Sequence, residues 1–126
     1  MNPQENLPST RDFQNVFANR CMAGDGLLLV FGRRNGLAKS RLGLSISRKY
    51  GSAVKRNRWK RLVREAFRRS RTELPENLDI VVVPGKQQRS DIMRDYEKSL
   101  KKLFRLVVKK LKKDIISKNS TERVGE

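Results

Sequence analysis

A dense group of cations occupies the segment AVKRNRWKRLVREAFRR, which runs from Ala53 to Arg69 and contains one acid, Glu65. Like charges at helical spacing repel by about 0.2–0.5 kcal/mol a pair, so such a segment is typical of a surface that meets an anionic partner. Arginine, the more frequent cation here, presents a planar fork of donors that pairs with phosphate and stacks on nucleobases. The chemistry that these residue types offer is the binding of a polyanion, with nucleic acid as the first candidate.

Helical spacing sorts this segment into two faces, because each residue turns an α-helix by about 100°. The apolar members gather on the side that we expect to face the core: Trp59, Leu62, Val63, Ala66 and Phe67. The opposite side gathers Asn57, Lys60, Arg61, Arg64 and Arg68. No aspartate or glutamate occurs between Gly26 and Arg64, whereas an ordinary solvated surface mixes both signs. This asymmetry favours nucleic-acid binding, although Asn57 is also a residue type that caps helices.

Residues for acid–base or metal chemistry are few. The chain has no histidine and one cysteine, Cys21, so it lacks the commonest general base and metal ligand and has no intrachain disulfide. Asp91 and Asp95 form the best carboxylate pair, four residues apart, but acids in a first helical turn also complement the helix dipole. We therefore predict no catalytic residue and no metal site within the chain.

Length and charge indicate one basic domain. The chain has 126 residues, a net charge of +17 and a pI of about 11, and we place the domain in residues 1–116 and a disordered polar tail in residues 117–126. The first residues lack the pattern of a secretory signal, and no stretch approaches roughly 18 apolar residues. We expect a cytoplasmic protein with no membrane partner.

Periodicity predicts helices at both ends of the chain. Ser9 is expected to cap a short helix that carries Phe13, Val16 and Phe17 on one face, before glycines at 24 and 26 end it. These aromatic side chains either pack in the core or remain available for stacking. A long amphipathic helix is expected from Ser90 onward.

Apolar and alternating runs predict strands at 27–31, 41–47 and 78–83. We expect the first two to pair as a hairpin around Asn35-Gly36. One face of the second strand carries only Gly43, Ser45 and Ser47, so a ligand is expected to approach its backbone closely.

One long motif resembles a known family. The segment SISRKYGSAVKRNRWKRLVREAFR, from Ser45 to Arg68, is similar to the signature of the bacterial ribonuclease P protein component. FQNVF (residues 13–17) resembles the first-helix motif of that family, and RLGLSISRK (residues 41–49) its central strand. The resemblance covers residues 7–112. It implies an α+β fold, a single-domain α/β sandwich with a small mixed sheet and a left-handed βαβ crossover carrying the basic helix.

The resemblance also implies a function and a set of residues. The chain would be the protein subunit of an endoribonuclease that removes the 5′ leader from precursor tRNA, with the catalytic centre and most of the bound Mg²⁺ in the RNA subunit, no organic cofactor and no obligate protein partner. The implied RNA-binding residues are Arg48, Lys49, Arg56, Asn57, Arg58, Lys60, Arg61, Arg64 and Arg68. The implied leader-binding cleft contains Phe13, Phe17 and Phe31. The sequence departs from the family pattern at Arg20, where many members have glycine, and at Phe31, where tyrosine is frequent.

Three other functions fit the composition. A structural RNA-binding protein shares the charge and size but not the ordered motifs. A DNA-binding regulator would need a helix that reads a major groove, and no helix-turn-helix spacing is evident. Binding to a membrane surface is disfavoured because the core requires the apolar face of the basic helix.

Overall fold

The computed structural model describes the backbone of residues 6–71, 74 and 77–124 and the side chains as far as residue 113. Its elements, in chain order, are α1 (Thr10–Ala18), β1 (Met22–Gly24), β2 (Leu28–Arg34), β3 (Arg41–Leu44), the 3-10 helix η2 (Arg48–Tyr50), α2 (Ala53–Ser70), β4 (Leu78–Pro84) and α3 (Met93–Val124).

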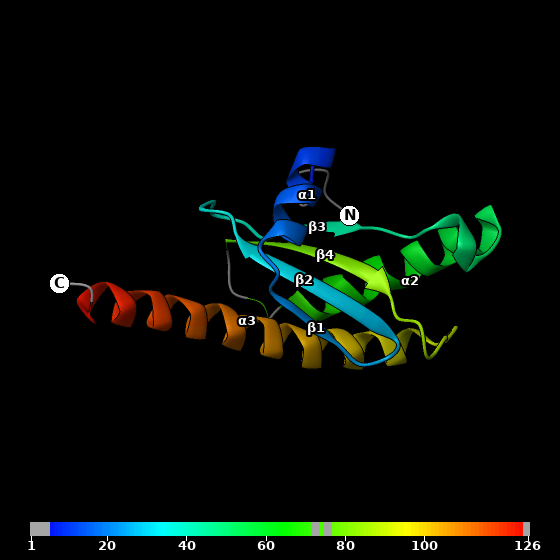
Figure 1. Cartoon of the computed structure of the whole chain (residues 1–126). Coiled ribbons are helices and arrows are strands. Elements are labelled where there is room, and N and C mark those ends of the chain that lie inside the picture. Colours follow the sequence, from blue (N-terminus) through cyan, green and yellow to red (C-terminus); the bar gives the residue numbers. More distant parts are fainter. Residues whose placement is uncertain (1–5, 72–73, 75–76, 125–126) are drawn as a thin grey trace.

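The four strands form one mixed sheet in the order β1-β2-β4-β3 (Figure 1). β2 pairs antiparallel with β1 and β4, whereas β3 pairs parallel with β4. The predicted hairpin between residues 27–31 and 41–47 is therefore wrong, because β4 lies between these two segments. The first five residues of β4, in the sequence LDIVVVP, are buried. Clusters of apolar residues cover both faces of β4, and β2 and β3 pair with its two edges, so this apolar strand lies inside the sheet.

Two segments differ from the sequence-based predictions. β1, which pairs with residues 29–31 of β2, was expected only as the end of the first helix, and three residues are too few for an alternating pattern to stand out. α3 begins at Met93 and continues to Val124, so residues 117–124, predicted to be a disordered tail, are helical in the structure. No proline or glycine interrupts residues 93–124, and the helical backbone can therefore continue.

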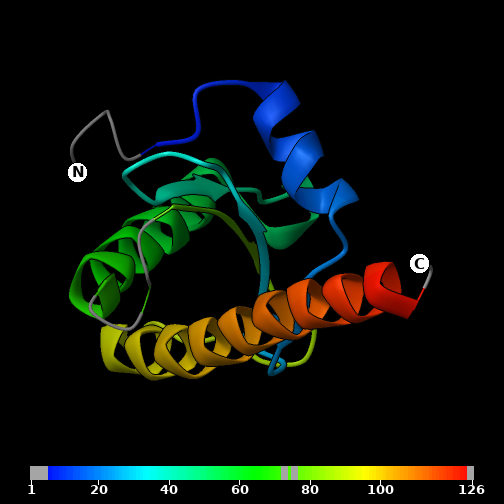
Figure 2. The same ribbon diagram turned by 90° about the vertical axis from the view of Figure 1, so that its left-hand side faces the viewer.

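Helices cover both faces of the sheet, but unequally. α2 and α3 pack side by side on one face, and α1 lies alone over the other (Figure 2). The larger core lies under α2 and α3 and includes the fully buried Trp59, Phe67, Tyr96 and Phe104. The predicted α+β class is confirmed. α2 connects the parallel neighbours β3 and β4 as a crossover, whose handedness stays a prediction of the resemblance.

The two shorter helices begin as their sequences predict. The Ser9 hydroxyl accepts a hydrogen bond from the backbone N–H of Asp12 at 3.2 Å, which caps α1. The Ser52 hydroxyl accepts from the N–H of Lys55 at 3.3 Å, which caps α2. Asn57 therefore lies inside α2 and is not its cap.

A buried ion pair connects the elements on the α1 side of the sheet. Asp79 of β4 is 1% exposed and accepts hydrogen bonds from Arg41 Nε at 2.8 Å and Arg41 Nη2 at 2.7 Å. Asn35, in the loop between β2 and β3, donates to the same carboxylate at 2.8 Å. Arg41 Nη2 also lies 3.4 Å from Asp12 Oδ1, at the start of α1. One carboxylate therefore joins β3, β4 and the β2–β3 loop, and through Arg41 it reaches α1.

We expect Asp79→Asn to lower the free energy of unfolding by about 3–5 kcal/mol, because it leaves Arg41 without its buried carboxylate. Urea denaturation measures this loss. Asp91→Asn is the matched control, because Asp91 lies 3.5 Å from Arg58 with side chains 77% and 62% exposed, and exposed pairs contribute about 0–1 kcal/mol. Equal losses in the two variants would contradict a special role for the buried pair.

Candidate RNA-binding surfaces

The outward face of α2 brings together five of the nine residues that the sequence predicts to bind RNA, whereas Arg58 faces Asp91 and Arg56 donates to the Gly51 carbonyl. Seven of the nine predicted residues are exposed, and Arg56 and Lys60 are half-buried. A shallow hollow of ≈ 610 Å³ runs along this face and is lined by Asn57, Lys60, Arg61, Arg64, Glu65 and Arg68. We call these six residues the α2 surface.

The opposite face of α2 packs as the helical spacing predicts. Trp59, Val63, Ala66 and Phe67 are buried, and Leu62 packs partly buried against the same core. Trp59 is thus a core residue, as the sequence favoured. The separation confirms that α2 uses one face for packing and leaves the opposite face accessible.

Glu65 is the one acid of the α2 surface, and it is held by two arginines. Arg68 donates to it through Nε at 3.2 Å and through Nη2, and Arg69 donates through Nε at 3.2 Å. These hydrogen bonds, that of Arg68 foremost, lower the pKa of Glu65 to about 2. Glu65 is therefore anionic at neutral pH, and it offsets part of the positive charge of Arg68.

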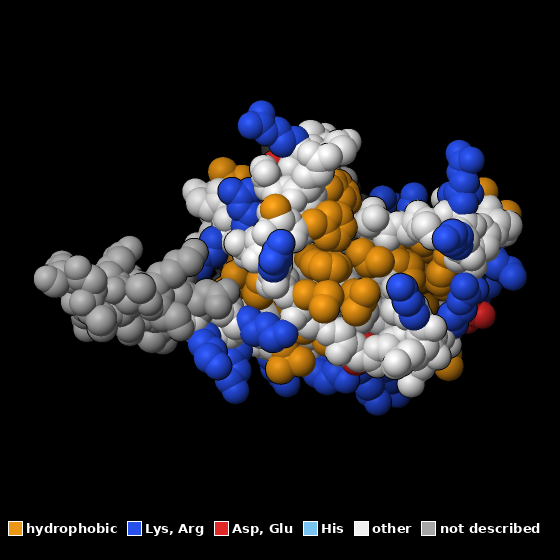
Figure 3. Space-filling model, in the orientation of Figure 1, with side chains coloured by type: hydrophobic (Ala, Val, Ile, Leu, Met, Phe, Trp, Pro, Cys, Tyr) orange, Lys and Arg blue, Asp and Glu red, His pale blue; other side chains and the backbone are white. Residues whose placement is uncertain are grey.

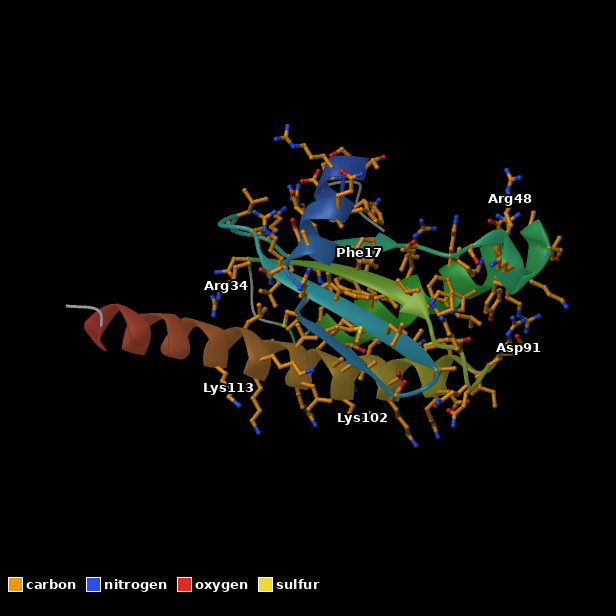
Figure 4. All side chains as sticks on the ribbon, in the orientation of Figure 1. Phe17, Arg34, Arg48, Asp91, Lys102 and Lys113 are labelled. Atoms are coloured by element: carbon orange, nitrogen blue, oxygen red, sulfur yellow. The ribbon has the colours of Figure 1, made fainter. Side chains whose placement is uncertain are left out.

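Arg48 and Lys49 lie in η2, the short turn that leads into α2, and both are exposed. Arg48 projects away from the body of the protein (Figure 4). The structure therefore places this basic pair beside the N-terminal end of α2, where the helix dipole is also positive.

The three predicted cleft residues meet between α1 and the sheet. Phe13, Phe17 and Phe31 are half-buried and pack around the buried Val16 and Val81. The rings of Phe17 and Phe31 lie edge to face, with centroids 4.8 Å apart and planes at 76°. Because these rings are only half covered, they take part in packing and also keep surface that a base can stack on.

This aromatic group belongs to a wider apolar surface. Figure 3 shows hydrophobic side chains across the sheet face beside α1, with lysine and arginine around the margin. A hollow of ≈ 490 Å³ at α1 is lined by Leu7, Pro8, Ser9, Thr10, Phe13, Gln14, Phe17 and Ser45. We call Phe13, Phe17, Phe31 and this hollow the aromatic cleft.

α1 and its lead-in fill part of the space over the small face of β3. Gly43 is buried, and a Cβ atom there would lie 2.6 Å from Phe13 Cζ and 2.7 Å from Leu7 Cδ1. The absence of a side chain therefore makes room for α1 and its lead-in, and Gly43 also lines a small hollow beside α2. Ser45, two residues on, is half-buried and lines the aromatic cleft, and Ser47 is exposed, so the prediction of close ligand approach stays open for this part of the face.

The α2 surface and the aromatic cleft meet at a shared hollow of ≈ 200 Å³. Its lining includes Lys60 and Arg64 from α2, Phe13 from α1 and Gly43 from β3. A single extended chain can therefore contact cations and aromatic rings without leaving the protein. Sequence spacing does not show this junction, because the four residues come from three separate elements.

A further hollow of ≈ 400 Å³ lies where η2 and α2 face the β4–α3 loop. Tyr50 and Trp59 have ring centroids 6.4 Å apart there, and the Arg89 guanidinium carbon lies 4.1 Å from the centroid of the Tyr50 ring. Sequence reasoning missed this group, since Arg89 is 39 residues from Tyr50 and no pattern joins them.

Asp91 and Asp95, the best carboxylate pair in the sequence, have different partners in the structure. Asp91 faces Arg58, whereas Asp95 accepts a hydrogen bond from the Ser90 hydroxyl. Within residues 6–71, 74 and 77–113, no three metal-ligating side chains come together. In the described part of the chain, no helix is long and apolar enough to span a membrane.

Comparison with known proteins identifies the family. A family model described as Ribonuclease P matches residues 1–108. The chain belongs to the ribonuclease P protein family. The ribonuclease P protein component of Thermotoga maritima is 39% identical over 105 residues, which cover 82% of this chain and 90% of the relative. The corresponding protein of Vibrio parahaemolyticus is 37% identical over 109 residues, covering 82% and 92%.

Solved structures of the ribonuclease P family share the fold. The protein from Thermotoga maritima has a TM-score of 0.71 and 34% identity, covering 80% of this chain and 96% of that one. The protein from Staphylococcus aureus has a TM-score of 0.67 and 28% identity, covering 79% and 91%. Members of the family act with an RNA subunit in tRNA 5′ processing, as part of a ribonucleoprotein endoribonuclease. The roles of individual residues on the two surfaces stay predictions.

Neighbouring residues of the α2 surface should change RNA affinity in opposite directions. Arg64→Ala is expected to lower the slope of log affinity against log salt for a bacterial ribonuclease P RNA by about one, the loss of one phosphate contact. Glu65→Gln is expected to raise affinity, because it removes an anion and releases Arg68. Glu65→Asp, which keeps the charge, is the control. Changes of the same sign in Arg64→Ala and Glu65→Gln would show that the α2 surface does not face the RNA.

Proposed function

We propose that this chain is the subunit of ribonuclease P that binds the catalytic RNA through the α2 surface and the 5′ leader of precursor tRNA through the aromatic cleft. The RNA then removes the leader to give the mature 5′ end. The observation that supports this arrangement is the hollow where Lys60 and Arg64 meet Phe13. It brings an RNA bound at the α2 surface next to a leader held in the aromatic cleft.

The α2 surface suits contact with a folded RNA. Arginine and lysine neutralise phosphates and release counterions, which gives strong binding with little dependence on sequence. Arg48 and Lys49 extend this surface beyond the N-terminal end of α2. Asn57, a neutral donor and acceptor within the surface, can orient a phosphate or a ribose.

The aromatic cleft suits a strand without fixed sequence. Stacking on an aromatic ring stabilises each base by about 1–3 kcal/mol and accepts any base. Phe31 has no hydroxyl, so it offers a stacking surface without a hydrogen bond to a base. A cleft of this kind can hold the leaders of many different precursor tRNAs.

In this proposal Mg²⁺ is bound mainly by the RNA. The residues of the α2 surface do not suit a metal site, because Glu65, their one carboxylate, is already bonded by Arg68 and Arg69. The contribution of the protein is to hold RNA phosphates close together against their mutual repulsion, so that the RNA needs less Mg²⁺ in solution. We place this activity in the cytoplasm.

Single-turnover cleavage of a precursor tRNA tests the proposal. A bacterial ribonuclease P RNA at low Mg²⁺ should cleave faster when the protein is present, and the protein alone should be inactive. RNA binding without stimulation would contradict the subunit role and favour a general structural RNA-binding protein. Cleavage by the protein alone would place catalytic groups in the chain.

Phe17→Ala should weaken binding of precursor tRNA to the assembled enzyme by at least about fivefold, the lower range for loss of one stacked base. Binding of mature tRNA, which has no leader, should change little. Val16→Ala is the matched control, because Val16 is fully buried in the same helix and does not line the aromatic cleft. An equal loss for precursor and mature tRNA, or an equal selective loss in both variants, would assign Phe17 to packing alone.

A further inference from the structure

A second group of cations lies along α3. On a helix that turns by about 100° per residue, eight of its lysines and arginines fall within a sector of about 120°. They are Arg94, Lys98, Lys101, Lys102, Arg105, Lys109, Lys112 and Lys113. We call this row the α3 stripe. At about 1.5 Å per residue it extends for about 28 Å along the helix.

The α3 stripe faces solvent because the opposite side of α3 forms the core. Leu100, Leu103, Phe104 and Val107 have no exposed surface, whereas every member of the stripe except the half-buried Lys101 is exposed. In Figure 4, Lys102 and Lys113 point away from the sheet, on the side opposite to Arg48. Lys60 and Arg64 of the α2 surface lie beside β3 and α1, whereas α3 packs against β1 and β2 as well as α2. The stripe is therefore a surface separate from the α2 surface.

Few acids neutralise the stripe. Lys101 pairs with Glu97 at 3.2 Å, and Lys102 pairs with Asp25 at 3.4 Å. Within the described residues Lys98, Lys109, Lys112 and Lys113 form no salt bridge. Like charges three or four residues apart each cost about 0.2–0.5 kcal/mol, so the stripe destabilises the isolated chain.

The helix dipole does not explain this arrangement. Cations stabilise a helix within its last turn, where unpaired carbonyl groups make the end negative. α3 continues to Val124, so Lys113 lies about three turns before the end of the helix. The row of lysines therefore indicates an anionic partner outside the chain.

We propose that the α3 stripe is a second RNA-binding surface, which contacts the sugar–phosphate backbone of a structured RNA segment distinct from the one at the α2 surface. The inference rests on the proposed function and extends it from one RNA contact to two. Six of the eight members are lysine, a compact point charge that suits phosphate and carries no base-reading geometry. No aromatic residue lies in the stripe, so stacking plays no part. Double-stranded RNA, which proteins recognise by shape and phosphate position, fits this pattern.

An anionic membrane fits the stripe less well than RNA. Surface-binding helices insert an apolar face between lipids, but the apolar face of α3 is buried against the sheet and α2. Among the described residues of α3, Leu106 is the one exposed large apolar side chain, at 42%. Little apolar surface is therefore available for insertion.

The test compares two double variants with the same change in charge. Lys98→Gln/Lys109→Gln removes two unpaired cations about 16 Å apart along the helix. Arg11→Gln/Lys86→Gln removes two exposed cations outside the α2 surface and the α3 stripe. Glutamine favours a helix about as well as lysine does, so α3 itself should persist. The probe is a bacterial ribonuclease P RNA, titrated at several salt concentrations and mapped by hydroxyl-radical footprinting.

The wild-type chain should protect two separate backbone segments of the RNA. Lys98→Gln/Lys109→Gln should lose protection of one segment and keep the other, lower the log–log salt slope by about two, and bind at least roughly tenfold more weakly at 0.15 M salt. Arg61→Ala/Arg64→Ala should lose the other segment. Arg11→Gln/Lys86→Gln should bind like the wild type.

Three outcomes would overturn the inference. The salt slopes of Lys98→Gln/Lys109→Gln and its control would be equal, or the footprint of the α3 variant would fade evenly over both RNA segments. In the third outcome the α3 variant would lose binding to anionic lipid vesicles and keep its RNA binding. The proposed function has a separate readout in the same samples. A wild-type chain that protects the RNA without stimulating cleavage contradicts the subunit role, whereas an α3 variant that matches its control contradicts only the second RNA contact.

Discussion

A buried carboxylate fixes the relative positions of the elements around the aromatic cleft. Burial of the Asp79 carboxylate is compensated by the donors that Arg41 and Asn35 supply to it. Those donors come from β3 and from the β2–β3 loop, and Arg41 also reaches Asp12 at the start of α1. The cost of burying an unpaired charge therefore selects one register for β3 and one position for α1. Phe13, one residue after Asp12, depends on that position.

The unequal cover of the two sheet faces creates the aromatic cleft. Two long helices pack on one face over the larger core, whereas α1 has only nine residues and covers part of the other. Phe17 and Phe31 lie at the boundary, where one side of each ring packs and the other side remains accessible. A longer first helix would complete a second core and leave no apolar surface for a flexible strand. Partial packing is thus the physical basis of the leader-binding proposal.

The net charge of +17 is compatible with a folded core because α2 and α3 each keep their cations on the solvent side. On α2 the cations are mostly arginine, whose planar fork suits phosphates and bases of a particular RNA structure. On α3 they are mostly lysine, which suits phosphate alone. The two helices therefore present chemically different surfaces, although they pack side by side on the same core.

The sequence by itself determined the two faces of α2, the cap at Ser9 and the family, because helical periodicity and motif order are local properties of the chain. It did not determine the strand order. The run at 78–83 pairs on both edges, with β2 and with β3, and its first five residues are buried. That central place results from competition among distant segments, which no local pattern records. Tertiary structure also decided that Gly43 makes room for Phe13, and it brought Lys60 and Arg64 against the aromatic cleft. Contacts between separate elements depend on how the sheet and helices pack, so they become visible only when the whole fold is assembled.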